Sequence, residues 1–271
     1  MLQLTPLPDR GAIAIEGDDR VAFLQGLVSN DVEAVRPGHA VWAALLSAQG
    51  KWQADFFVFS DGNTLLLDCE AAHIPMLIQR LSRYRLRMQV SLRPAPDLHV
   101  YVAWDGMPDV DGVIAPDPRL PDFAWRILAR DSLAATASVE DWDRRRLAAG
   151  LPDGSKDMEP DRSVLLEAGF DELAGVSWSK GCYMGQELTA RTRYRGLIKR
   201  RLLPVAINGA LPLPGTPVLK AGTEVGTMRS GRDKIGLASI RLDAIGATLL
   251  CGDATLVPFT PAWMRLPVAV S

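Results

Sequence analysis

The sequence predicts an α+β protein that ends in a separate, small β-barrel or sandwich. Strands and helices are mixed up to Gly196, whereas the chain beyond it holds only short strands separated by glycine and proline. In addition, 48% of the 271 residues are apolar and the net charge is only -2. This balance is typical of a folded globular chain and excludes disorder.

Apolar periodicity places the individual elements. The predicted strands of the first part are 11–16, 41–47, 54–60, 64–69, 88–92, 98–104 and 123–129. The predicted helices are 21–28, 71–86, 138–149 and 186–193. The triplet Asp61-Gly62-Asn63 predicts a hairpin turn between two of these strands. The proline-rich residues 105–122 predict a loop or a boundary, and the polar residues 152–163 predict an exposed loop. The predicted strands of the last part are 201–207, 216–221, 223–230, 234–242, 247–252 and 254–259.

Several classes of protein are disfavoured by composition. No apolar run approaches the ~18 residues of a membrane span, and the first residues lack the basic and apolar pattern of a secretory signal. We therefore expect neither a membrane partner nor export. Cys69, Cys182 and Cys251 are widely spaced, which predicts free thiols in a reducing, cytoplasmic location and no zinc site. A pI near 6.0 argues against a dedicated DNA-binding protein.

The most unusual segment is SKGCYMGQELTARTRYRG, residues 179–196. Gly181 and Gly185 allow a tight turn that leads into a helix, and the start of a helix favours negative charge. A thiol at such a position, with Lys180 and Arg191 nearby, is expected to have a lowered pKa and to be reactive or to bind metal. The alternative is that Cys182 is a small residue packed in a turn.

The chemistry available to Cys182 is limited by its surroundings in the sequence. No histidine follows His99, so a cysteine hydrolase lacks an obvious base. One thiol cannot hold an iron–sulfur cluster alone, because such clusters take four ligands. Any cluster at Cys182 would therefore draw its remaining ligands from another molecule.

Two basic runs carry alternative interpretations. They form either solvated faces or an anion groove for phosphate, a polycarboxylate tail or RNA. The first run contains Arg191, Arg193, Arg195, Lys199, Arg200 and Arg201, and the second contains Arg80, Arg83, Arg85, Arg87 and Arg93.

The octapeptide KGCYMGQE, followed by LTARTRYRG and a β-rich tail, resembles the signature of the YgfZ family. The segments GDDRVAFLQGLVSNDVEAVRPG, LLEAGFDELAGVSWSKGCYMGQE, VGTMRS and LASIRLD extend the resemblance over most of the chain. Members of that family are folate-binding proteins linked to iron–sulfur cluster maturation or repair, and they are similar in fold to the aminomethyltransferase (T-protein) of glycine cleavage. The resemblance implies two interleaved ferredoxin-like α+β domains and a C-terminal antiparallel β-barrel around a folate-sized hole. It places the first domain at 1–40 plus 125–196, the inserted second domain at 41–124, and the barrel at 197–271.

The resemblance also implies ligands and site residues. The cofactor would be tetrahydrofolate or a one-carbon derivative, with an iron–sulfur cluster shared with a partner. Glu167 in LLEAG matches the pterin-binding glutamate of the T-protein pattern, and Asp55 is the second candidate carboxylate. Cys182 would lie at the rim of the pocket as the reacting group or cluster ligand. The other expected pocket residues are Lys180, Tyr183, Gln186, Glu187 and Arg191. The alternative for Gln186 and Glu187 is a structural role in the first turn of the helix.

Two main functions follow from these expectations. The first is a folate-binding accessory factor whose partners are iron–sulfur assembly or client proteins, RNA-modifying iron–sulfur enzymes among them. The second is a folate-dependent aminomethyl or demethylating transferase, whose aspartate pair is here reduced to Ala54-Asp55. RNA binding through the arginine runs is a third hypothesis.

Overall fold

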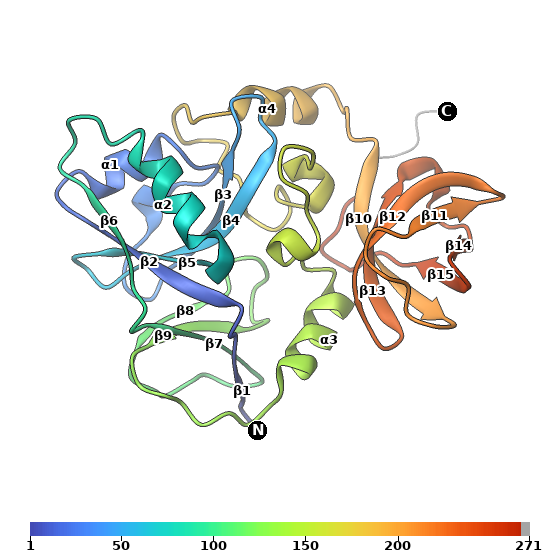
Figure 1. Cartoon of the computed structure of the whole chain (residues 1–271), viewed down its shortest axis with the longest axis horizontal. Coiled ribbons are helices and arrows are strands. Elements are labelled where there is room, and N and C mark those ends of the chain that lie inside the picture. The colour runs from blue at the N-terminus through green and yellow to red at the C-terminus, as the bar shows by residue number, and fades with distance from the viewer. Residues whose placement is uncertain (267–271) are drawn as a thin grey trace. The chain divides into compact units, whose positions relative to one another are not determined.

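The computed structural model describes residues 1–266 and shows an α+β chain that ends in a closed antiparallel β-barrel (Figure 1). The chain divides into two compact units. The first comprises Met1–Val139 and Leu173–Gln186, and the second comprises Glu140–Glu172 and the chain from Glu187 onward.

The first sheet of the first unit has the antiparallel order β3-β4-β5-β2-β6. Its strands are β2 (Arg10–Glu16), β3 (Val41–Leu46), β4 (Trp52–Ser60), β5 (Leu65–Glu70) and β6 (Ser91–Pro94). The hairpin between β4 and β5 turns where predicted, because Asp61 Oδ1 accepts the backbone N–H groups of Asn63 and Thr64. Helices α1 (Arg20–Gln25) and α2 (Ile74–Ser82) bury Phe23, Leu24, Leu77 and Leu81 in the same apolar core as strands β2 to β5.

The second sheet of the first unit has the order β1-β7-β9-β8. Its strands are β1 (Gln3–Pro6), β7 (His99–Trp104), β8 (Val113–Pro116) and β9 (Trp125–Ala129). Strand β8 lies inside residues 105–122, where the sequence predicted a loop or a boundary, so a loop forms only part of this segment. Because β8 is an edge strand, it pairs on one side only, and prolines are tolerated at such a position.

The second unit contains most of α3 (Val139–Ala149), most of α4 (Gln186–Tyr194) and the barrel. The barrel order is β10-β13-β12-β11-β14-β15, closed between β10 and β15. Its strands are β10 (Arg200–Asn208), β11 (Pro217–Lys220), β12 (Thr223–Arg232), β13 (Ile235–Arg241), β14 (Leu249–Cys251) and β15 (Ala254–Pro258). The loss of helical periodicity predicted a barrel or a sandwich, and the structure confirms the barrel that the family resemblance implied.

The strand pairing differs from the domain boundaries that the family resemblance implied. Strand β2, expected in the first domain, pairs with β5 and β6, while β7, expected in the inserted domain, pairs with β1 and β9. The division of the chain into two units also differs from the expected domains, since residues 140–172 group with the barrel. Pairing partners are chosen by long-range backbone hydrogen bonds, which no local pattern reports.

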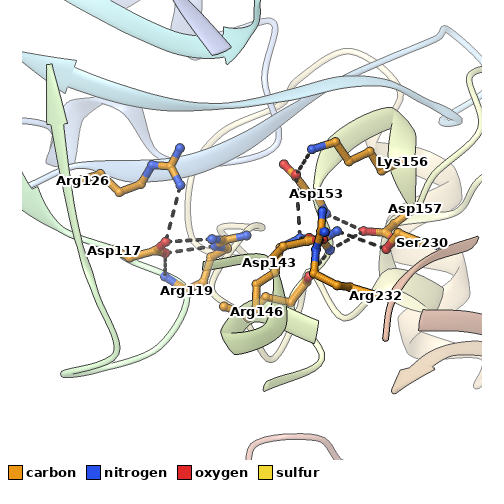
Figure 2. Close-up of polar contacts among 11 residues, drawn as sticks. Asp117, Arg119, Arg126, Asp143, Arg146, Asp153, Lys156, Asp157, Ser230 and Arg232 are labelled. Atoms are coloured by element: carbon orange, nitrogen blue, oxygen red, sulfur yellow. Dashed lines mark hydrogen bonds and ion pairs between the residues drawn. The ribbon is translucent and has the colours of Figure 1, made fainter. Parts of the chain in front are cut away.

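A buried chain of charges joins the two sheets of the first unit. Asp68 on β5 accepts hydrogen bonds from Arg126 on β9 at 2.6 Å and from Arg10 on β2 at 2.5 Å. Asp117 accepts from Arg119 at 2.7 Å and lies 3.8 Å from Arg126 (Figure 2). Burial alone would raise the pKa of Asp117, but the two arginines outweigh it and hold that pKa below its usual value.

A second buried ionic cluster lies in the other unit. Arg146 on α3 donates to Asp157 at 3.0 Å and to Asp143 at 2.7 Å, and Asp157 also accepts from the Ser230 hydroxyl (Figure 2). Asp157 and the neighbouring Met158 are buried. The prediction that residues 152–163 form an exposed loop is therefore wrong in part, because Arg146 brings the polar Asp157 into the interior as its ion-pair partner.

Candidate functional site

Cys182 is exposed, whereas Cys69 and Cys251 are buried. Burial raises the pKa of the Cys69 thiol to about 12 and also raises the pKa of the Cys251 thiol. Both buried thiols are therefore protonated and shielded at neutral pH. In the part of the chain that the structure describes, Cys182 alone offers an accessible thiol for chemistry or ligation.

The turn that carries Cys182 is tied to the segment after α1. The Ser177 N–H donates to the Ser29 carbonyl at 3.0 Å, and the Met184 N–H donates to the Gly26 carbonyl at 3.2 Å. Lys180 reaches the same segment and donates from Nζ to backbone carbonyls at 2.6–2.8 Å. The turn is therefore anchored before and after the cysteine, while the cysteine itself faces solvent.

Gly185 is required by the backbone of this turn. Its φ is +80°, and a Cβ there would lie 2.5 Å from the Ser47 carbonyl oxygen. Gly181 is different, since a Cβ added there would meet no atom within 4 Å. The two glycines that the sequence presents as a pair thus have unequal roles.

The remaining motif residues lie around the start of α4. Tyr183 is buried, and its ring lies 5.2 Å from Lys180 Nζ. Gln186 Oε1 accepts the Tyr183 N–H at 3.2 Å, which caps the turn. Arg191 donates to Glu187 at 2.5 Å one helical turn away, and both side chains are exposed. Gln186 and Glu187 thus make contacts within the protein, which agree with the structural role given as the alternative to ligand binding. Any contact of these residues with a ligand stays a prediction.

Asp55 on β4 is held inside the first unit. Its side chain is buried, with Oδ2 accepting from the Trp42 indole at 2.8 Å and Oδ1 from the Trp52 indole at 3.2 Å. Both oxygens are therefore committed to the protein. This arrangement favours a structural role over the ligand-binding role that the sequence suggested.

Glu167 belongs to the second unit. It lies in a 3-10 turn, Leu165–Ala168, that Gly169 ends at φ +83°. Its side chain is half-buried, and within residues 1–266 its carboxylate has no hydrogen-bond or ion-pair partner. A half-buried carboxylate with free acceptor positions suits a ligand that offers paired N–H donors.

Comparisons with known proteins place this architecture in a family. The mitochondrial iron–sulfur cluster assembly factor IBA57 of Mus musculus is 31% identical over 281 residues, covering 90% of this chain and 78% of the relative. The IBA57 protein of Homo sapiens is 31% identical with the same coverage, and the homologue of Mycosarcoma maydis is 34% identical over 79% of this chain and 59% of its own length. This chain belongs to the IBA57 family of iron–sulfur cluster assembly factors. The CAF17 C-terminal β-barrel domain also matches, over residues 199–266.

A solved structure confirms the predicted fold. Glycine cleavage system aminomethyltransferase T from Bartonella henselae superposes with a TM-score of 0.72, covering 97% of this chain and 86% of that one. At 14% identity the likeness concerns the fold alone. The resemblance to the YgfZ family is supported at the level of the IBA57 family, and the narrower assignment stays a prediction.

The IBA57 relatives correct one expectation from the cysteine pattern. Those reported above are described as mitochondrial, which points to the mitochondrion and overturns the predicted cytoplasmic location. Reduced thiols are common to both compartments, so the cysteine count could not separate them.

In the structure, carboxylates lie beside several cations of the first basic run of this IBA57-family chain, so less of its positive charge is available to an anion than the sequence suggests. Arg201 is buried and paired with Glu172 at 2.9 Å, and Arg193 lies 3.8 Å from Asp171. With Arg191 paired to Glu187, half of the run faces a carboxylate. Binding of RNA stays an untested prediction.

Residues 1–266 contain neither a candidate metal-binding cluster nor a helix that could span a membrane. No set of three histidine, cysteine, aspartate or glutamate side chains is grouped there to hold a metal ion. No helix in the same range combines the length and apolar content needed to cross a bilayer.

Proposed function

We propose that this IBA57-family chain assists the assembly or repair of iron–sulfur proteins, with Cys182 as the sulfur that contacts the cluster or a partner's thiol. The observation that carries the proposal is the exposed thiol on a turn anchored at both ends. The relatives are named iron–sulfur cluster assembly factors, and these names supply the process in which we propose that the chain acts. A fixed and accessible sulfur is what a transient contact with a cluster requires.

The cluster in this proposal is a substrate shared with another protein. Clusters normally take four protein ligands, and the described residues group no metal-binding set around Cys182. The partner therefore contributes the remaining ligands. This division favours transfer of the cluster between the two proteins, because only one bond to this chain has to break.

The decisive prediction concerns the thiol. In a strain that lacks the protein, we expect Cys182→Ser to leave iron–sulfur enzyme activity near the level of the empty strain, because a hydroxyl is a poor ligand for iron. Activity of an iron–sulfur enzyme in cell extracts is the measurement, with protein abundance checked on a blot. Cys251→Ser is the matched control, since its buried sulfur is expected to have no role. Full activity with Cys182→Ser would contradict the proposal.

We further propose that the chain binds tetrahydrofolate, a carrier of one-carbon units, through Glu167. Glu167 fits this role, since its half-buried carboxylate is free to accept a pair of N–H groups from the edge of a pterin. Asp55 does not fit, because two indoles already occupy it. An aminomethyl or demethylating transferase needs a carboxylate poised at the folate nitrogen, and the commitment of Asp55 disfavours that activity.

Glu167→Gln tests the folate proposal. We expect the affinity for tetrahydrofolate to fall about tenfold, because a forked, charge-assisted contact becomes a weaker neutral one. Calorimetric titration of the purified protein measures the change. Glu224→Gln, an exposed position on β12, is the control and should bind as the wild type does. Equal affinities for all three proteins would remove Glu167 from the site.

A further inference from the structure

The Lys180 side chain points inward from the turn that presents Cys182. Its Nζ donates to the carbonyl oxygens of Gln25 at 2.6 Å, Val28 at 2.8 Å and Asn30 at 2.8 Å. An ammonium has three protons, so each finds an acceptor. The Tyr183 ring adds an aromatic contact to the same cation.

The backbone carbonyls of Gln25, Val28 and Asn30 form a cage around this ammonium, and further hydrogen bonds hold the cage in place. Asn30 donates from Nδ2 to the carbonyls of Trp42 and Ala174, both at 2.7 Å. Ser29 donates from Oγ to the Gly175 carbonyl at 2.7 Å and accepts the Ala44 N–H at 2.9 Å. The segment after α1 is thereby fixed to β3 and to the chain that leads into the turn. The hydrogen bonds made by the Ser29 and Asn30 side chains therefore keep the backbone carbonyls that receive the ammonium in place.

The cage stabilises a cation where burial opposes one. Burial lowers the pKa of Lys180 to about 8, and the carboxylates of Asp31 and Glu33 counteract part of that effect. Of the three acceptors, the Gln25 carbonyl is at the C-terminal end of α1, where a helix exposes unpaired acceptors and favours positive charge, while the Val28 and Asn30 carbonyls lie in the segment that follows. A neutral side chain of equal length would leave these acceptors without a donor.

We propose that Lys180 is a positioning residue, whose ammonium ties the Cys182 turn to the backbone carbonyls of Gln25, Val28 and Asn30 and so fixes the place at which the sulfur meets its partner. The inference rests on the proposed function in taking Cys182 as the contact sulfur. It assigns Lys180 a role different from the ligand contact that the sequence suggested, because its protons are already donated within the protein. Cys182 is then presented by a turn with one conformation.

Chemical rescue tests this role. A nitroxide label on Cys182 reports the mobility of the turn, and the exposed thiol can be labelled while the buried ones are protected. We expect a broad, restricted spectrum for the wild type and a shift to a narrow, mobile spectrum for Lys180→Ala. Added n-propylammonium, which reproduces the deleted atoms, should restore the restricted spectrum. Tetramethylammonium, which has no N–H group, should not.

Lys180→Met is a second variant, which keeps the test possible if Lys180→Ala fails to fold, because methionine preserves the apolar stem of the lysine side chain. It fills the path to the cage without supplying a donor, so we expect a mobile label that n-propylammonium does not restrict. A label as restricted in Lys180→Met as in the wild type would overturn the proposal, as would equal rescue by both cations.

The cell assay separates the two proposals. Lys180→Met should lower iron–sulfur enzyme activity towards the Cys182→Ser level at unchanged protein abundance. If Cys182→Ser were fully active, the proposed function would fail while the label spectra could still show the anchoring. If the spectra failed to shift while Cys182→Ser stayed inactive, only the role of Lys180 would be overturned.

Discussion

Replacing Asp68 with asparagine is expected to lower the free energy of unfolding by about 3–5 kcal/mol. The Asp68 side chain is fully buried and accepts hydrogen bonds from Arg10 and Arg126, which are themselves buried. Without that charge, both guanidinium groups would lose this partner in the interior, and Asp117 would remain as a counter-charge 3.8 Å from Arg126. The cost is that of leaving buried cations uncompensated, because the lost attraction is no longer available to offset their desolvation.

Urea unfolding, followed by circular dichroism, measures this loss. Asp97→Asn is the matched control in the same unit, because Asp97 pairs with Arg130 on the surface, with side chains 49% and 72% exposed. We expect that change to stay within about 1 kcal/mol, as is usual for exposed pairs. Similar losses from both variants would show that burial of the Asp68 network contributes nothing specific.

Gly185→Ala is expected to lower the free energy of unfolding by about 2–4 kcal/mol and to displace the turn that carries Cys182. The positive φ at this position disfavours any side chain, and the new Cβ would overlap the Ser47 carbonyl oxygen and Leu46. The strain can be relieved only by moving the turn away from the hairpin between β3 and β4. We therefore also expect a loss of iron–sulfur enzyme activity in the cell assay.

Gly181→Ala is the internal control for this prediction. The two glycines flank the same cysteine, but an added Cβ at Gly181 has open space around it. We expect a change in stability within about 0.5 kcal/mol and full activity in cells. If Gly181→Ala were as harmful as Gly185→Ala, the effect would come from chain stiffness and not from the close approach to Ser47.

The elements that could be predicted are those with a strong local pattern. The apolar runs of β3, β4 and β5 and the hairpin at Asp61 appear in the structure close to their predicted bounds. The helix expected over 71–86 is shorter, with α2 ending at Ser82. Strands β1 and β8 were missed because they lie at the two edges of one sheet, where one neighbour suffices and proline is tolerated.

Charged residues within apolar strands are visible in the sequence, but their ion-pair partners could not be inferred from it. Asp68 and Arg126 each interrupt an otherwise apolar strand, which is the available indication of an interior ion pair. Their pairing joins two sheets, so it depends on contacts between strands far apart in the chain. The same holds for Asp55, whose commitment to Trp42 and Trp52 appears only once β3 and β4 are paired.

By itself, the sequence determined a separate C-terminal part made of strands alone, the mixed α+β part and the glycine-flanked turn at Cys182, because these features follow from periodicity and turn chemistry within a few residues. Only the tertiary structure decided that Cys182 is exposed, that Gly185 and not Gly181 is constrained, and that Lys180 faces the carbonyls after α1. The physical reason is that exposure, close approach and hydrogen-bond partners are set by residues far away in the chain, which meet when the two sheets and their connections pack.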